Sequence, residues 1–287
     1  MNETVFQNSG SVNTLLGSIN RLSSFLPLRY LVNKTTTLNY KYSVIPDVAP
    51  DAPPKLQYFG LGIKGFYCTS DGTISHVKYN PDCRNMDLYS PIPIRVVPLA
   101  EDLAWEDRKM YRMRVVTSII GAQYVCYYLK KIVWDPDSVQ LIEKHTDGSE
   151  TEYTLDSSYL TPELPTSAQT GGGELTSATR IIVRALGNCN VSMDELANTV
   201  SLFDLNYATI SEIGFYTGCD VYLDETGTLM ADVPVDSDDL TDGAESIEAA
   251  YVQLAKHKTQ LPITLENEGS SLNATISFEE SSSIAVI

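Results

Sequence analysis

The feature that most constrains the fold is a pair of long β-forming runs separated by a short turn. MYRMRVVTSII (residues 110–120) and QYVCYYLKKIVW (residues 123–134) are rich in β-branched and aromatic residues, and Gly121-Ala122 joins them. Runs of this kind predict an antiparallel hairpin, here at the centre of a sheet. Because side chains alternate along a strand, Arg112 and Arg114 are expected on the same face.

A glycine-rich segment between residues 55 and 69 also indicates a strand. Gly60, Gly62 and Gly65 spell G-x-G-x-x-G, the fingerprint of dinucleotide-binding loops. In that motif a helix follows the glycines, whereas here the turn sequence Ser70-Asp71-Gly72 follows. The segment therefore favours a bent strand in which the backbone approaches its neighbours closely. A second hairpin is predicted around the turn residues Asp147-Gly148.

Four segments carry helical signals. Apolar residues at three- and four-residue spacing predict a helix over residues 12–26, and residues 99–110 place acidic side chains early and basic ones late. Ser192 and Glu195 have the spacing of a capping box, which predicts a helix from about residue 193. Residues 245–258 predict a further helix, with four residues on one face: Ile247, Ala250, Tyr251 and Leu254.

Together these signals predict an α+β fold that is predominantly β, with two β-rich domains, a few short helices and an extended N-terminal arm. The arm is placed at residues 1–58, with a docking helix and a Pro-rich segment, and the first β-rich domain at 59–160. Pro, Ser, Thr and successive glycines make 161–175 a flexible linker. An acidic α+β domain follows at 176–287.

The charge of the chain is strongly divided along its length. Residues 1–134 carry 15 Lys and Arg against 10 Asp and Glu, a net charge of +5, whereas residues 135–287 carry 5 against 27, a net charge of −22. The overall charge of −17 argues against a nucleic-acid partner, since phosphate binding requires clustered cations. The division favours either a polarised interface between subunits or an acidic surface that serves solubility.

No catalytic, cofactor or metal site is indicated. Five scattered cysteines lack a CxxC pair, three histidines stand apart, and no G-x-S-x-G elbow occurs. An acidic loop at 232–245 departs from the EF-hand spelling, so a solvated loop before a helix is favoured over a calcium site. The N-terminus lacks a secretory pattern and no run is long enough to span a membrane, so synthesis in a reducing cytosol and no membrane partner are expected.

Two sets of sequences resemble known proteins. PPKLQYFGLGIKGFY (53–67), DLYSPIPIRVVP (87–98) and MYRMRVV…YYLKKI resemble virion structural proteins of tailed bacteriophages. ISEIGFYTGCD (210–220) with LDETGTLMADV (223–233) is similar to a pattern that recurs in phage tail, collar and fibre-attachment proteins. The resemblance implies a non-enzymatic component of the neck, collar, tail or baseplate, present in several copies around a symmetry axis. It implies synthesis in the host cytoplasm and residence in the virion.

The leading hypothesis is thus a virion protein that forms a homo-oligomeric ring, contacts other virion proteins and bridges neighbouring rings through its N-terminal arm. Its association is expected to weaken as salt rises. The alternatives are a capsid decoration protein or stand-alone binding module, and a particle-associated hydrolase. Candidate interface residues are basic in the first half and acidic in the second, unless all six are merely solvated: Arg112, Arg114, Asp236, Asp238, Asp239 and Asp242.

Overall fold

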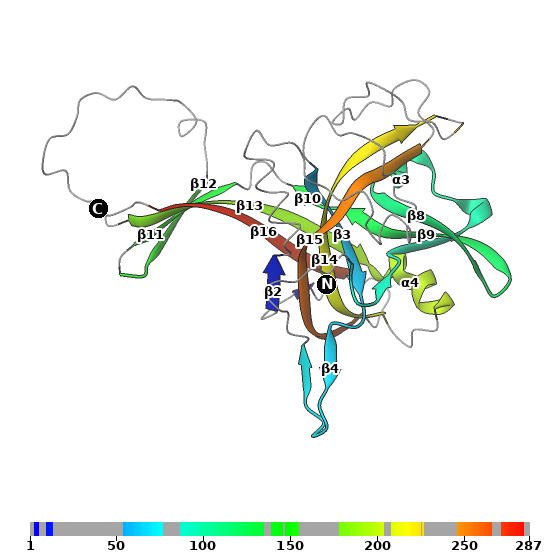
Figure 1. Ribbon diagram of the computed structural model, residues 1–287, viewed down its shortest axis with the longest axis horizontal. Helices are drawn as coiled ribbons and strands as arrows, with labels where there is room; N and C mark the ends of the chain where they lie inside the picture. Colours follow the sequence, from blue (N-terminus) through cyan, green and yellow to red (C-terminus); the bar gives the residue numbers. More distant parts are fainter. Residues whose placement is uncertain are drawn as a thin grey trace, which may run out of the picture. The chain divides into compact units, whose positions relative to one another are not determined.

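The computed structural model describes residues 3–5, 10–13, 54–76, 87–134, 139–145, 147–154, 178–203, 208–224, 226, 246–265 and 271–283. These residues divide into two compact units (Figure 1). Unit 1 comprises residues 1–132 and 190–273, and unit 2 comprises residues 133–189 and 274–287. Strands predominate in both, which confirms the predicted fold class. The predicted linker 161–175 lies outside the described residues, and the division into domains at that linker stays a prediction.

Unit 1 is built on an eight-stranded sheet. Its main order is β2-β15-β14-β3-β9-β7, with β6 paired to β3 and β8 paired to β9, and all these pairings are antiparallel. The strands are β2 (Gly10–Asn13), β3 (Lys55–Gly62), β6 (Pro91–Ile92), β7 (Arg95–Pro98), β8 (Tyr111–Ile119), β9 (Ala122–Lys131), β14 (Ala208–Leu223) and β15 (Ser246–Leu265).

Smaller elements complete unit 1. A two-stranded ribbon of β4 (Phe66–Cys68) and β5 (Ile74–His76) extends from the sheet, and β1 (Glu3–Val5) pairs in parallel with the start of β16 (Ser271–Ser283). Three short helical segments are described: η1 (Leu99–Glu101), α3 (Trp105–Arg108) and α4 (Met193–Leu202). The helix expected over residues 99–110 is thus broken in two.

Unit 2 is a smaller antiparallel arrangement. It holds β10 (Val133–Trp134), β11 (Gln140–His145), β12 (Glu150–Thr154) and most of β13 (Ala178–Ser192), with the later part of β16. Ile142 and Ile182 are buried partners across β11 and β13. The predicted hairpin at Asp147-Gly148 is confirmed, because β11 and β12 pair across it.

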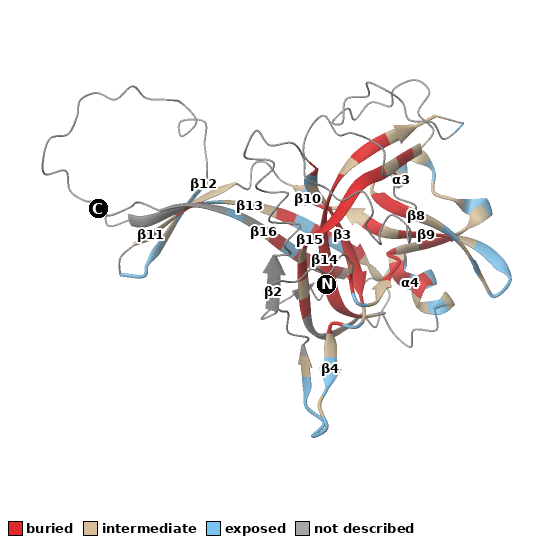
Figure 2. Cartoon of the chain, viewed as in Figure 1, coloured by how far each residue is buried: buried red, intermediate tan, exposed pale blue. Residues whose placement is uncertain are grey.

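The core of unit 1 lies where β3, β14 and β15 meet β8 and β9 (Figure 2). Its central cluster combines aromatic and aliphatic side chains: Tyr58, Met113, Leu129, Tyr216, Ala249, Val252 and Leu254. The glycines of β3 and β14 allow close packing here. A Cβ atom on Gly65 would lie 2.1 Å from the carbonyl oxygen of Ser211, so the close approach predicted for the glycine-rich strand is confirmed.

The prediction of a helix over residues 245–258 is wrong, because this segment is the first part of strand β15. β15 carries more residues than its partner β14 at several points, where the register shifts. Each bulge changes which residues face the core, so apolar residues recur at three- and four-residue spacing in an extended strand. The strand is also buried on both faces, including Tyr251, whose φ of 53° lies in the left-handed region. A single sequence does not reveal these bulges, because they depend on the partner strand.

Other predicted elements fare as follows. The capping box is confirmed: Ser192 caps α4, its Oγ accepts from the Glu195 backbone N–H at 3.2 Å, and the Glu195 carboxylate accepts from the Ser192 N–H at 2.8 Å. The docking helix was predicted from Val12, which instead belongs to β2. The rest of that helix and the Pro-rich segment lie outside the described residues.

Candidate functional site

An ion cluster cross-links four strands of unit 1, and its Tyr58, Arg112 and Asp220 side chains are buried. The Asp220 carboxylate on β14 accepts from Arg112 Nε on β8 at 2.7 Å and from the Tyr58 hydroxyl on β3 at 2.5 Å, both at Oδ1. Lys131 Nζ, at the end of β9, lies 2.6 Å from Oδ2. Each partner is fixed by its strand, so the cluster joins strands that are distant in the sequence.

The electrostatics of this cluster make it structural. Burial by itself would raise the pKa of Asp220, but the charges of Arg112 and Lys131 and their hydrogen bonds outweigh it and lower the pKa to about 2. Burial and the neighbouring carboxylate hold the pKa of Tyr58 well above its usual value. A carboxylate that stays ionised with both oxygens engaged is a poor general base. The cluster therefore ties the sheet together.

The guanidinium of Arg112 also closes the end of α3. Its Nη1 donates to the carbonyl oxygens of Arg108, Lys109 and Tyr111 at 3.1, 2.9 and 2.8 Å. Arg108 in turn pairs with Glu248 of β15 at 2.7 Å. Carbonyl groups at a helix C-terminus have no intrahelical partner, and a buried cation satisfies them.

Arg114 has a separate intramolecular partner. Its Nε and Nη2 donate to Asp102 Oδ2 at 2.9 and 2.7 Å, while Tyr127 donates to Asp102 Oδ1 at 2.6 Å. Burial alone would raise the pKa of Asp102, but the hydrogen bonds from Tyr127 and Arg114 bring it below its usual value.

The six candidate interface residues are therefore not brought together. Arg112 is fully buried, which removes it from the surface on which we predicted it, and Arg114 is half-buried with its charge paired. The four aspartates of the predicted acidic face, Asp236, Asp238, Asp239 and Asp242, lie outside the described residues, so their interface role stays a prediction.

A second buried polar group lies where β14 and β15 pair. The Glu212 carboxylate accepts from the backbone N–H groups of Lys64 and Tyr89 at 2.7 and 2.8 Å, and its Oε2 lies 3.2 Å from His257 Nε2. Ser211 Oγ accepts from the Gly65 N–H at 3.0 Å. Serine, histidine and carboxylate thus occur together, but each of them is fully buried. As folded, the group fixes two loops against the sheet and presents no nucleophile to a substrate.

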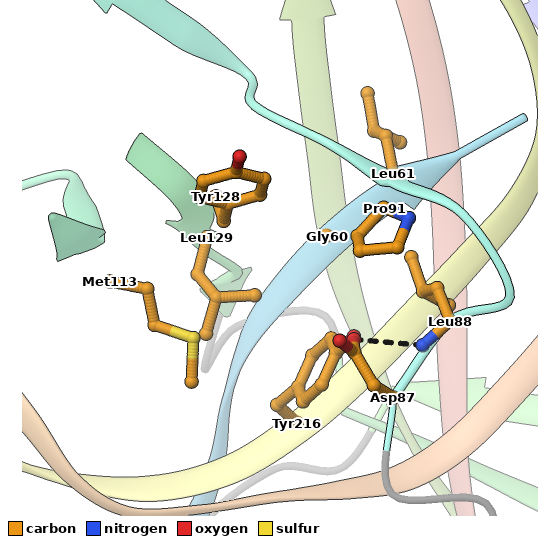
Figure 3. Close-up of a pocket in the computed structure, with 9 residues that line it drawn as sticks. All are labelled: Gly60, Leu61, Asp87, Leu88, Pro91, Met113, Tyr128, Leu129 and Tyr216. Carbon is orange, nitrogen blue, oxygen red and sulfur yellow. Dashed lines mark hydrogen bonds between the residues drawn. The ribbon is translucent and has the colours of Figure 1, made fainter. Parts of the chain in front are cut away.

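A small pocket is lined by residues of β3, β8, β9 and β14, among others (Figure 3). It has no room for a water molecule. Asp87 reaches its rim, where Oδ1 accepts from the Leu88 N–H at 2.8 Å and from the Tyr216 hydroxyl at 3.0 Å. Among the described residues, no group of three His, Cys, Asp or Glu side chains could hold a metal ion.

In contrast to these buried groups, unit 1 exposes large apolar side chains at two places, which we call the tip and the ribbon. The tip is the turn of the β8-β9 hairpin, where Ile120 is 91% exposed. The ribbon is β4-β5, where Tyr67 and Ile74 are 45% and 49% exposed (Figure 2). Large apolar side chains gathered on projecting elements are typical of protein contact surfaces. These are the best candidates for a functional site.

Sequence reasoning located the hairpin but missed its tip. The hairpin is confirmed by the pairing of β8 with β9, yet its turn is Ile120-Gly121, one residue earlier than expected. The signal available was an isoleucine where hairpin turns favour Asn.

No helix among the described residues is long and apolar enough to cross a membrane. No curated protein and no solved structure matches this chain. The model of one family, described as a family of unknown function (DUF7208), matches residues 1–233. Since that match spans more than half of the sequence, the chain belongs to this family.

Proposed function

We propose that this chain is a non-enzymatic structural component of a tailed-phage virion. It assembles in multiple copies around the axis of the neck, tail or baseplate and bridges neighbouring protein rings. The observation that carries the proposal is the exposure of large apolar side chains on the tip and the ribbon, while the buried Arg112 and Glu212 side chains of the same unit are hydrogen-bonded within the chain.

Three further features support an assembly role over catalysis. Ser211, Glu212 and His257 are closed to solvent, and the cavity beside Tyr216 is too small for a substrate. The strand-rich fold includes a two-stranded ribbon and a long hairpin whose exposed edges can pair with or pack on a neighbouring subunit. The resemblance of residues 53–67 and 87–98 to phage virion proteins supports a tailed-phage virion as the particle in which the chain assembles.

The test combines the purified chain with the particle proteins encoded beside it. Light scattering would measure the mass of the chain alone and in these mixtures, and mass spectrometry would measure its abundance in purified particles. We expect an assembly of several copies, alone or with a neighbouring protein, and several copies per particle. A chain that joins nothing and is missing from particles would contradict the proposal. A monomer that binds only finished particles would indicate a decoration protein.

A further inference from the structure

The tip carries an unusual residue for its turn. The two residues between Ile119 and Ala122 both have positive φ, 50° at Ile120 and 79° at Gly121, which is the pattern of a type I′ turn. Asn and Gly adopt this conformation readily, whereas a β-branched side chain is strained in it. The strained side chain is also the one that is 91% exposed. Within one copy of the chain, Ile120 therefore neither favours the turn conformation nor buries apolar surface.

The chemistry around the tip selects a protein partner. Residues 117–123 are Thr, Ser, Ile, Ile, Gly, Ala and Gln, without a charged or aromatic side chain. Binding to nucleic acid or to an anionic membrane surface draws on Lys and Arg, and a membrane interface also favours Trp and Tyr. An uncharged apolar tip fits an uncharged apolar surface on another protein.

The outer edge of β8 adds backbone groups to this surface. Tyr127 of β9 directs its carbonyl away from β8, to the N–H of Ile94 at 2.8 Å. Arg114, which lies opposite Tyr127, is therefore in a non-hydrogen-bonded pair. Because hydrogen-bonded and non-hydrogen-bonded pairs alternate along an antiparallel strand, Val116 and Ser118 also direct their backbone N–H and C=O groups to the outer edge of β8. In the part of the chain that the structure describes, no strand pairs with that edge. Such an edge is a template for an added strand.

The ribbon has the properties of a matching surface. Cys68 lies opposite Ile74, and Tyr67 lies opposite Ser75, so exposed apolar side chains occur on both of its faces. Its only charged group among residues 66–75 is Asp71 at the turn, which accepts hydrogen bonds from Thr69 and Thr73. A two-stranded ribbon is marginally stable in water by itself, and packing against another surface would stabilise it.

We propose that the tip of one copy docks on the ribbon of a second copy, with Ile120 against Ile74 on the face that also carries Cys68. This inference rests on the proposed function and names the partner of its contact surface. The two elements leave unit 1 in different directions (Figure 1), so the contact joins different copies. Because tip and ribbon are different surfaces, the contact is heterologous, and its repetition generates a ring or an open filament. Being apolar, it persists at high salt, unlike a contact between opposite charges.

The first experiment compares matched variants of the full chain by light scattering over a range of concentrations. Ile120→Asn keeps a residue that suits the turn, so it should fold, and we expect its self-association to weaken at least tenfold. Ile74→Ser should weaken association similarly from the other side. Val133→Ser removes an exposed apolar side chain that lies on neither the tip nor the ribbon, so it is the control and should associate like the parent chain. Equal association of Ile120→Asn and the parent, or a parent chain that stays monomeric alone, would overturn the inference.

The second experiment identifies the neighbour of the tip. Ile120→Cys is treated with a short bis-maleimide, which can link it to the exposed Cys68 of another copy. Mixing labelled and unlabelled chains separates links between copies from links within one, and peptide mapping locates them. We expect a link between residue 120 and Cys68 across copies. If the chain enters particles with the neighbouring proteins while Ile120→Asn assembles normally, the docking inference fails and the proposed function stands; a chain that joins nothing fails both.

Discussion

Arg112 and Ile120 lie on the same hairpin, but one side chain is buried and the other is exposed. Arg112, near the base, is fully buried with its charge paired to Asp220, whereas Ile120, at the tip, is almost fully exposed. A buried charge adds stability only when its partners are all present. An exposed apolar side chain adds stability only when a second surface covers it. The base therefore serves the fold of one copy, and the tip is suited to contact between copies.

A partner could be recognised through opposite charges or through exposed apolar side chains. The division of charge along the sequence suggested a polarised interface, but in the described residues Arg108, Arg112, Arg114 and Lys131 are paired within unit 1. Large apolar side chains are exposed on the tip and the ribbon. Substitutions at the base and at the tip should consequently change different properties, stability in one case and association in the other.

The largest expected effect is at the base. Asp220→Ala leaves Arg112 buried without its counter-charge, and removing one partner of a buried pair costs about 3–5 kcal/mol. The free energy of unfolding, measured by urea titration, should fall by that amount. In the matched control, Asp220→Asn keeps an acceptor oxygen for Arg112 and Tyr58 and should lose less. Equal losses in the two variants would contradict the account of the cluster.

The next largest effect is at Glu212. Glu212→Ala removes the acceptor for the backbone N–H groups of Lys64 and Tyr89, and each of these part-buried hydrogen bonds to a carboxylate contributes roughly 1–2 kcal/mol. We expect a loss of stability of roughly 2–4 kcal/mol with little change in association. Glu212→Gln keeps one acceptor oxygen and should recover part of the loss. Hydrogen exchange at the Lys64 and Tyr89 amides would show whether the two loops are released.

Low pH should reduce the stability that the Asp220 cluster contributes. Its folded pKa of about 2 lies below the unfolded value of roughly 3.9, so the stability it contributes is complete above pH 4 and disappears as pH falls toward 2. At about 1.4 kcal/mol per pKa unit, the contribution is about 2–3 kcal/mol. Unfolding titrations at pH 5, 4, 3 and 2 should show a steeper acid loss in the parent chain than in Asp220→Asn. A parallel acid loss in both would place the titrating group elsewhere.

The smallest effect on stability has the opposite sign and is at the tip. Ile120→Asn relieves the strained turn, so the isolated chain should become more stable by about 0.5–1 kcal/mol even as its association weakens. Thermal unfolding at a concentration where both chains are monomeric measures this change. Destabilisation by Ile120→Asn would mean that the isoleucine supports the hairpin itself.

Local features of the molecule were predictable from the sequence, and non-local ones were not. The β8-β9 hairpin and the Ser192 capping box depend on neighbouring residues, and both are confirmed. The bulges that make β15 resemble a helix depend on its pairing with β14. The Arg112–Asp220 pair joins residues that are 108 positions apart, and no pattern in a single sequence links them. The exposure of Ile120 required knowledge of the turn to within one residue.

The most direct test of the central claim, that this is an assembly protein, is the mass of the chain by light scattering at low and high salt, alone and with the particle proteins encoded beside it. We expect an assembly of several copies that persists at high salt. Dissociation at high salt would indicate instead that the copies associate through the opposite charges of the two halves of the sequence. A monomer that joins nothing at either salt concentration would contradict the account.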